Sequence, residues 1–287
     1  MTLFKPRLFD ERSTHLGEGV LWHPEREQLF WFDILENKLL SRDGDTPLEW
    51  TFHENVSAAG WTGQDTLLIA SETRLFEFNL ATGSETFVAH LEPHDPGSRS
   101  NDGRADPLGG FWIGMMAKRG QSRPGAIYRY YKGELRMILA PITVANAICF
   151  TPDGTEAYFS STRDGKIYRT ALDNDGWPVG DPVLLVHEQG YLIDGMVCAA
   201  NGTLWNTQYK AGRVAVYSPQ GTLLETHAIP GKHTTCPGFG GPDLKTLFVS
   251  TARQDLSAQE CAANPAHGQT FALETQTTGQ KEYRVLL

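Results

Sequence analysis

The sequence lacks the marks of membrane-spanning, secreted and nucleic-acid-binding proteins. Across its 287 residues no apolar stretch approaches the roughly 18 residues of a membrane-spanning helix. The N-terminal segment contains no apolar core of the kind that a secretory signal needs. The 25 Lys and Arg residues are outnumbered by 34 Asp and Glu residues, for a net charge of −9, and no long basic run occurs. These absences predict a protein with neither a nucleic-acid nor a membrane partner.

Cysteine is also scarce. The four cysteines form no CxxC pair, and they are Cys149, Cys198, Cys236 and Cys261. We expect all four to be buried free thiols, because Cys behaves as a small hydrophobic residue where it is neither paired nor bound to metal. Free thiols fit a reducing cytoplasm, so a cytoplasmic location is expected.

Helical periodicity is nearly absent, and short apolar runs alternate instead with Gly- and Pro-rich turns. These runs recur along the chain at intervals of 40 to 48 residues. The repeated entry strands begin at Val20, Gly60, Gly103, Ile148, Met196 and Gly238. Four short strands per repeat at this period are typical of a β-propeller blade. The sequence therefore predicts an all-β, six-bladed propeller with four-stranded blades around a central channel, as one domain over residues 1–287.

The ends of the chain are expected to close the ring. Residues 1–17 precede the first full repeat, and we expect the segment RLFDERSTHLGEG to supply the outer strand of the last blade beside the C-terminal YRVLL. Such closure removes free sheet edges. Two stacked β-sandwiches would be an alternative, but they need a domain boundary, and the sequence contains no linker.

Polar residues just before an apolar entry strand are the candidates for chemistry, because these strands line the channel of a propeller. Glu18, Asn146 and Asp194 occupy equivalent positions in three of the repeats. Their oxygen atoms suit a hard cation such as Ca²⁺, Mg²⁺ or Mn²⁺, with Zn²⁺ also open. Three protein ligands leave positions for water and substrate. The alternative is that each side chain caps the turn before its strand.

Several segments together resemble one known family over nearly the whole chain. They include LGEGVLWHPEREQLFWFDI, RSNDGRADPLGGFWIGMM, VANAICFTPDGTEAYFSST and IDGMVCAANGTLWNTQYKAGRV. This pattern is similar to that of the SMP-30/gluconolactonase/luciferin-regenerating-enzyme family. The resemblance implies a six-bladed propeller with one divalent metal ion in its channel, and hydrolysis of sugar lactones to the open-chain acids.

The resemblance also implies roles for individual residues. Matched position by position, Glu18, Asn146 and Asp194 fall on the metal ligands, and Asp194 on the general base proposed for the family. Arg99 and Asn101 fall on substrate-binding positions. The implied partner is a small sugar lactone, bound by a monomer or weak homo-oligomer.

Two positions depart from the family pattern. Members often have Asn-Gly-Leu where this chain has Asn146-Ala147-Ile148, so the ligand remains but the glycine does not. Lys118 stands where some members carry an acidic residue. If Lys118 faces the channel, it could pair with the far carboxylate of an aldarolactone. If it is a solvated surface lysine, a neutral aldonolactone is the expected substrate.

Other functions remain open on the sequence. The same fold could bind calcium or a small ligand without turnover, hydrolyse another ester, or serve as a protein-interaction propeller with a decayed site. Arg99 and Asn101 favour the lactonase, because a metal buffer has no use for groups that bind ring hydroxyls. Their polarity also argues against an aromatic lactone or organophosphate, which would need an apolar channel mouth.

Overall fold

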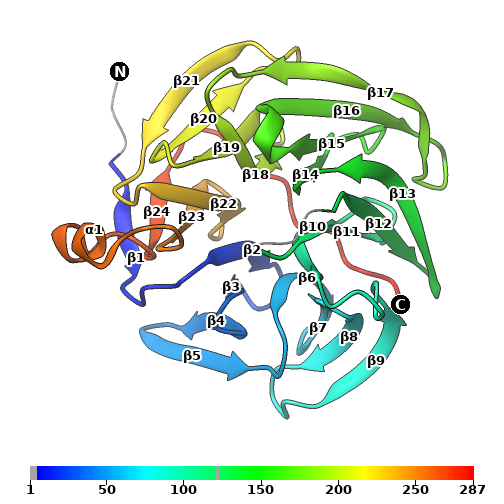
Figure 1. The fold of residues 1–287 in the computed structure, drawn as a ribbon, viewed down its shortest axis with the longest axis horizontal. Helices are drawn as coiled ribbons and strands as arrows, with labels where there is room; N and C mark the ends of the chain where they lie inside the picture. Colours follow the sequence, from blue (N-terminus) through cyan, green and yellow to red (C-terminus); the bar gives the residue numbers. More distant parts are fainter. Residues whose placement is uncertain (1–4, 120–122) are drawn as a thin grey trace.

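The computed structural model describes residues 5–119 and 123–287 and has the form of a six-bladed β-propeller. The blades surround a central channel, and each is a four-stranded antiparallel sheet (Figure 1). The sequence prediction of fold class is confirmed.

Each blade runs from an innermost strand at the channel to an outer strand at the rim. The first three blades are β2 (Gly17–His23), β3 (Gln28–Asp33), β4 (Lys38–Asp43) and β5 (Thr46–Thr51); β6 (Val56–Gly63), β7 (Thr66–Ser71), β8 (Arg74–Asn79) and β9 (Glu85–His90); and β10 (Ser98–Ala105), β11 (Phe111–Ala117), β12 (Gly125–Tyr131) and β13 (Glu134–Ile142).

The other three blades follow the same order. They are β14 (Ala145–Phe150), β15 (Glu156–Ser161), β16 (Lys166–Leu172) and β17 (Pro178–His187); β18 (Leu192–Cys198), β19 (Leu204–Tyr209), β20 (Arg213–Tyr217) and β21 (Leu223–Ala228); and β22 (His233–Gly240), β23 (Thr246–Ala252), β24 (Thr270–Glu274) and β1 (Arg7–Asp10). A short 3₁₀ helix η1 (Thr162–Asp164) and helix α1 (Ala258–Ala263) lie in loops.

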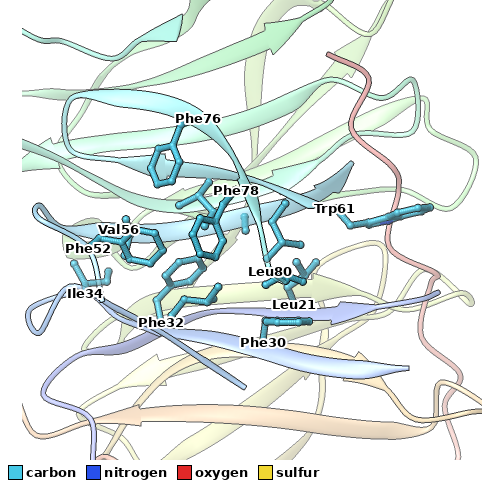
Figure 2. Packing of buried hydrophobic residues seen from close by; sticks show 14 of the residues in the cluster. Leu21, Phe30, Phe32, Ile34, Phe52, Val56, Trp61, Phe76, Phe78 and Leu80 are labelled. Carbon is cyan, nitrogen blue, oxygen red and sulfur yellow. The ribbon is translucent and has the colours of Figure 1, made fainter. Parts of the chain in front are cut away.

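Aromatic and aliphatic side chains between neighbouring blades form the core. Figure 2 shows the cluster between the first two blades, where Phe30 and Phe32 of β3 face Phe76 and Phe78 of β8. Phe52 packs edge-on against Phe78, with ring centroids 5.1 Å apart. Because both faces of a blade are covered in this way, burial of apolar surface holds the blades in a fixed ring.

The ring closes with β1 beside β24, antiparallel. The N-terminal segment therefore supplies the outer strand of the last blade, as predicted, but the expected partner YRVLL was wrong. Residues 283–287 instead lie across other blades, where the Val285 amide donates to the Trp61 carbonyl at 2.9 Å and the Leu286 amide to the Gly109 carbonyl at 2.8 Å.

The C-terminal tail covers the end of the channel where the innermost strands finish (Figure 1, red). The Gln280 side chain donates to the carbonyls of Phe150 and Cys198, each at 3.0 Å, and Glu282 pairs with the buried Arg104. The opposite end, where the innermost strands begin, is the end that can admit a ligand.

Two smaller expectations are settled by the structure. Cys149, Cys198 and Cys236 are buried free thiols, but Cys261 is only partly buried because it lies on the short surface helix α1, so that prediction was wrong for Cys261. Within the described ranges, no helix is long and apolar enough to cross a membrane.

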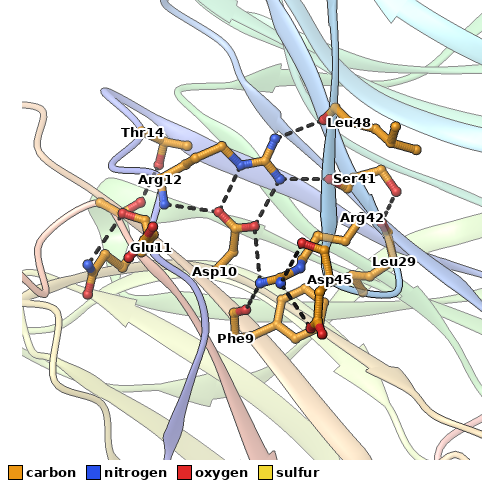
Figure 3. Close-up of polar contacts among 12 residues, drawn as sticks. Phe9, Asp10, Glu11, Arg12, Thr14, Leu29, Ser41, Arg42, Asp45 and Leu48 are labelled. Carbon is orange, nitrogen blue, oxygen red and sulfur yellow. Dashed lines mark hydrogen bonds and ion pairs between the residues drawn. The ribbon is translucent and has the colours of Figure 1, made fainter.

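The buried Asp10 carboxylate connects the last blade of the ring to the first. Asp10, at the end of β1, accepts from the Arg12 side chain at 2.9 Å and lies 3.7 Å from Arg42 of the first blade (Figure 3). Arg12 also donates to the carbonyls of Ser41 and Leu48, at 2.7 and 2.8 Å. The last blade is thereby joined to the first through charge-assisted hydrogen bonds.

Replacing Asp10 with alanine should lower the free energy of unfolding by about 2–3 kcal/mol, because two partly buried guanidinium groups lose their carboxylate. The measurement is urea unfolding followed by circular dichroism. Arg7→Ala is the matched control on the same strand: its ion pair with Glu274 is solvent-exposed, so a change within about 0.5 kcal/mol is expected. Equal effects of the two substitutions would show that the Asp10 cluster does not hold the ring closed.

Candidate functional site

Irregularities in the innermost strands place the candidate residues. The register between the first two strands shifts immediately after Glu18, Asn146 and Ile193, the residue before Asp194. Such bulges redirect side chains from the sheet face. The same shift follows Ser100 in β10 and Thr234 in β22, so five blades share it. Glu18 and Asn146 stand at the shift and Asp194 directly after it, at one end of the channel.

The predicted residues meet in one cavity of about 250 Å³ at that end. Glu18, Asn146 and Asp194 line it together with Arg99 and Asn101 of β10. All five side chains are nearly inaccessible to solvent. Residues that are 176 positions apart in sequence are thus brought together by the ring, since Glu18 lies on β2 and Asp194 on β18.

Hydrogen bonds fix the orientation of Asn146 and Asp194. The Asn146 amide nitrogen donates to an Asp194 carboxylate oxygen and, at 3.2 Å, to the Thr162 hydroxyl. Behind Asp194, the Asn206 side chain donates to the carbonyls of Asp194 and Gly195 at 3.0 and 2.9 Å. Asn206 thereby holds the backbone of the bulge in place.

Arg99 and Asn101 form a second pair in the cavity. One Arg99 nitrogen donates to the Asn101 side-chain oxygen and to the Ser100 carbonyl, both at 2.8 Å. The Asn101 amide nitrogen donates to the Ala145 carbonyl at 3.2 Å. These contacts use one terminal nitrogen of Arg99, so its other nitrogen atoms can serve a ligand.

The cavity has an excess of buried negative charge. Burial raises the pKa of Glu18 well above its ordinary value, and the charges of Asp194 and Asp102 raise it further, while Arg99 lowers it. Burial likewise raises the pKa of Asp194, with Asp102 adding to the effect and the Asn146 hydrogen bond opposing it. Arg99 is the one cation acting on both Glu18 and Asp194 among the described residues.

These residues fit a divalent cation. One Glu18 carboxylate oxygen is buried and has no hydrogen-bond partner among the described residues, which is costly unless a cation is bound. Two carboxylates and one amide give the all-oxygen ligands that hard cations prefer. A half-turn of the Asn146 amide exchanges its nitrogen for its oxygen. Within the described part of the chain, no three His, Cys, Asp or Glu side chains are arranged to hold a metal, so the amide is needed.

Ala147 takes the conformation that favours glycine, with φ of 59°. Gly19, the residue after Glu18, has nearly the same value, 57°. The residue after the candidate ligand Asn146 therefore keeps the left-handed conformation, although it is alanine here and often glycine in the family. The Ala147 side chain is fully buried in an apolar cluster, and this packing offsets the backbone strain.

Lys118 lies apart from the other candidates. It lines a wider outer cavity of about 790 Å³ that Arg99 also borders, and it does not line the inner cavity. Its ammonium group lies 2.9 Å from Glu72. Lys118 therefore faces the mouth of the site, with its charge already paired.

The sequence reasoning assigned no role to several residues at the site, among them Asp102, Thr162 and Arg163. Asp102 follows Asn101 directly, and its carboxylate accepts from the backbone of Ile148 at 2.7 Å. Its position beside Asn101 in the RSNDG segment could have indicated that it lies near the site. Thr162 and Arg163 belong to η1 and line the cavity. No sequence motif marks them, because the fold of the 3₁₀ turn alone brings them to the cavity.

Comparison with known proteins agrees with this geometry. Residues 16–253 match the family described as the SMP-30/gluconolactonase/LRE-like region. L-arabinolactonase of Azospirillum brasilense is 32% identical over 96% of this chain and 94% of its own length. The chain belongs to the SMP-30/gluconolactonase/LRE-like family. The resemblance stated from the sequence is confirmed.

Two further relatives of this family cover nearly the whole chain. 6-Deoxy-6-sulfogluconolactonase of Pseudomonas putida is 30% identical over 93% of this chain and 94% of its own length. A calcium-binding protein, regucalcin, from Agrobacterium tumefaciens has a solved structure that is 37% identical. It superposes with a TM-score of 0.96 over 99% of this chain and 98% of its own.

Because the pKa of Glu18 is raised, we expect the thermal stabilities of wild type and Glu18→Gln to depend differently on pH. With a chelator present, Glu18 holds its proton to higher pH in the folded state than in the unfolded state, so the wild type becomes less stable as pH rises past the ordinary pKa. The variant lacks this penalty. Its thermal midpoint should match wild type near pH 5 and exceed it by several degrees at pH 8.

Adding a divalent cation at pH 8 should reverse that order, because ion binding stabilises the wild type more. The measurement is differential scanning calorimetry with chelator or with Mg²⁺, Ca²⁺, Mn²⁺ or Zn²⁺. Glu36→Gln, which changes an exposed carboxylate, serves as the control and should give parallel curves. A Glu18→Gln variant that is less stable than wild type in chelator at pH 8 would contradict the interpretation.

Proposed function

We propose that this protein is a divalent-metal-dependent sugar lactonase, which hydrolyses an aldono- or aldarolactone to the open-chain sugar acid. The observation that carries the proposal is the convergence of Glu18, Asn146 and Asp194 with Arg99 and Asn101 in one buried cavity. Relatives covering nearly the whole chain are named for the hydrolysis of sugar lactones. We propose further that residues 1–287 act as one domain, because the five candidate residues come from four different blades.

Glu18, Asn146 and Asp194 would hold the ion. A divalent cation in such a site supplies Lewis-acid polarisation of a carbonyl and lowers the pKa of water. Regucalcin relatives and a neighbouring calcium-binding structure support a divalent ion. Ca²⁺, Mg²⁺, Mn²⁺ and Zn²⁺ are all candidates, since oxygen ligands discriminate little among them.

Asp194 is the proposed general base. Burial raises the pKa of its carboxyl, while the Asn146 hydrogen bond and the Arg99 charge lower it. A bound cation would further favour the ionised form that a general base needs. A carboxylate has two oxygen atoms, so one could serve the ion while the other accepts the proton of an attacking water. Asn206 limits the movement of the strand that carries it.

Arg99 and Asn101 would position the sugar. Arg99 is buried, and the backbone carbonyl and the Asn101 oxygen fix its guanidinium plane. Its uncommitted nitrogens can donate to ring hydroxyls, and a substrate held in one orientation reacts faster. Arg99 also stabilises the ionised forms of Glu18 and Asp194, because its positive charge lowers the pKa of both.

Replacing Asp194 with asparagine should reduce lactone hydrolysis by at least about 100-fold, because a general base commonly contributes that much. Acid release is followed with a pH indicator on a panel of aldono- and aldarolactones, after chelation and with each metal added back. Circular dichroism should show an intact fold. Asp181→Asn, an exposed change on the outer strand β17, is the control and should keep wild-type rates.

An active Asp194→Asn enzyme would remove Asp194 as the base. A wild-type protein that binds metal but hydrolyses no lactone in the panel would instead favour the binding-protein or other-ester alternative. Turnover that survives chelation would contradict metal dependence.

A further inference from the structure

The mouth of the site carries positive charge on an otherwise acidic protein. The outer cavity is bordered by one acidic side chain, Asp255, and by five basic ones: Arg99, Lys118, Arg119, Arg123 and Arg163. The whole chain has a net charge of −9. A cavity lined by charge of one sign concentrates ligands of the opposite sign.

Most of these cations are already paired. Lys118 lies 2.9 Å from Glu72, Arg119 lies 3.1 Å from Asp255, and Arg123 lies 3.0 Å from Glu92. Arg99 lies deeper and faces the Glu18 and Asp194 carboxylates. A ligand that used one of these groups would have to displace a protein carboxylate or compete with it.

Arg163 differs from the others. Within residues 5–119 and 123–287, its side chain makes no ion pair or hydrogen bond, and it borders both the outer and the inner cavity. It follows Thr162, whose hydroxyl accepts from Asn146, so its backbone is held close to the candidate metal ligands. The left-handed Gly165 ends the turn that presents it.

Besides Arg99 and Arg163, one more cation among the described residues borders the inner cavity, Lys210. The Lys210 ammonium lies 5.9 Å from the centre of the Tyr209 ring, a cation–π contact that occupies part of its charge. Arg163 is therefore the cation at the mouth with the least compensation. A guanidinium group also binds carboxylates and sulfonates through two parallel hydrogen bonds, which an ammonium cannot do.

We propose that the substrate is a sugar lactone with an oxyanion group, a carboxylate or a sulfonate, on the end of the carbon chain remote from the lactone carbonyl, and that Arg163 binds this group. The proposal rests on the proposed lactonase function. It replaces Lys118 with Arg163 as the anchor, because Lys118 is paired with Glu72 and does not reach the inner cavity lining. The carboxylate made by the reaction is distinct, since it forms beside Glu18 and Asp194.

The first test compares wild-type kcat/KM for three lactones of similar size: a neutral aldonolactone, an aldarolactone with a terminal carboxylate, and an aldonolactone with a terminal sulfonate. At least one anionic lactone should be preferred over the neutral one by about 10-fold or more at low salt. The preference should shrink as ionic strength rises, because Arg163 is exposed. Preference for one of the two anions identifies the group, and preference for the neutral lactone overturns the proposal.

The second test measures the anionic-to-neutral selectivity ratio in variants. Arg163→Gln should lower the ratio by about 10- to 100-fold, mainly through KM for the anionic lactone, which is the range of a charge-assisted hydrogen bond. Arg163→Lys should restore part of it. Arg119→Gln, another arginine at the mouth but one paired with Asp255, should keep the ratio within about 2-fold. An equal loss in Arg119→Gln, or a larger loss in Lys210→Gln, would overturn the assignment to Arg163.

A binding measurement separates failure of this proposal from failure of the lactonase itself. Isothermal titration calorimetry compares an open-chain aldarate dianion with the matching aldonate, on wild type and Arg163→Gln. Tighter binding of the dianion to wild type, lost in the variant, supports the anion site even if no lactone is hydrolysed. Equal binding of both acids to both proteins overturns the anion site even if lactones are hydrolysed.

Discussion

The arrangement of the molecule depends on one electrostatic constraint, which is the burial of three carboxylates at one end of the channel. Glu18, Asp102 and Asp194 are at most 5% exposed, and burial raises the pKa of each. Buried like charges repel one another and lose hydration, so the surrounding structure must be rigid enough to keep them together. Arg99 and a bound cation would compensate this charge from within the cavity.

The propeller supplies that rigidity from several directions. Each of the three carboxylate side chains belongs to an innermost strand, and neighbouring blades cover both faces of that strand. The C-terminal tail ties the far ends of these strands together, and Glu282 of the tail pairs with Arg104, whose charge in turn lowers the pKa of Asp102. The Glu282 charge raises the pKa of Asp102, so the two members of this ion pair act on that carboxylate in opposite directions.

The repeat in the sequence was enough to predict the six blades, and the equivalent positions of Glu18, Asn146 and Asp194 were enough to predict that they meet. Both inferences rest on periodicity, which one sequence displays directly. The partner of β1 was mispredicted because YRVLL and TFALE are both short apolar runs, and only tertiary hydrogen bonds to Trp61 and Gly109 distinguish them. Arg163 was missed because no pattern marks a side chain that a 3₁₀ turn brings to a cavity.

The difference between the predicted deep residues and the missed Arg163 follows from where each lies in the fold. The deep residues stand on innermost strands, where a bulge and two covered faces leave a side chain little freedom. The mouth residues come from the loops joining the second and third strands of their blades: Lys118 follows β11, Arg163 follows β15, Lys210 follows β19 and Asp255 follows β23. Loops tolerate substitution better than packed strands do. Under the proposed function, hydrolytic chemistry could therefore remain fixed in the strands while the loops change which lactone is admitted. We propose that the charge on these loops sets the specificity of this chain.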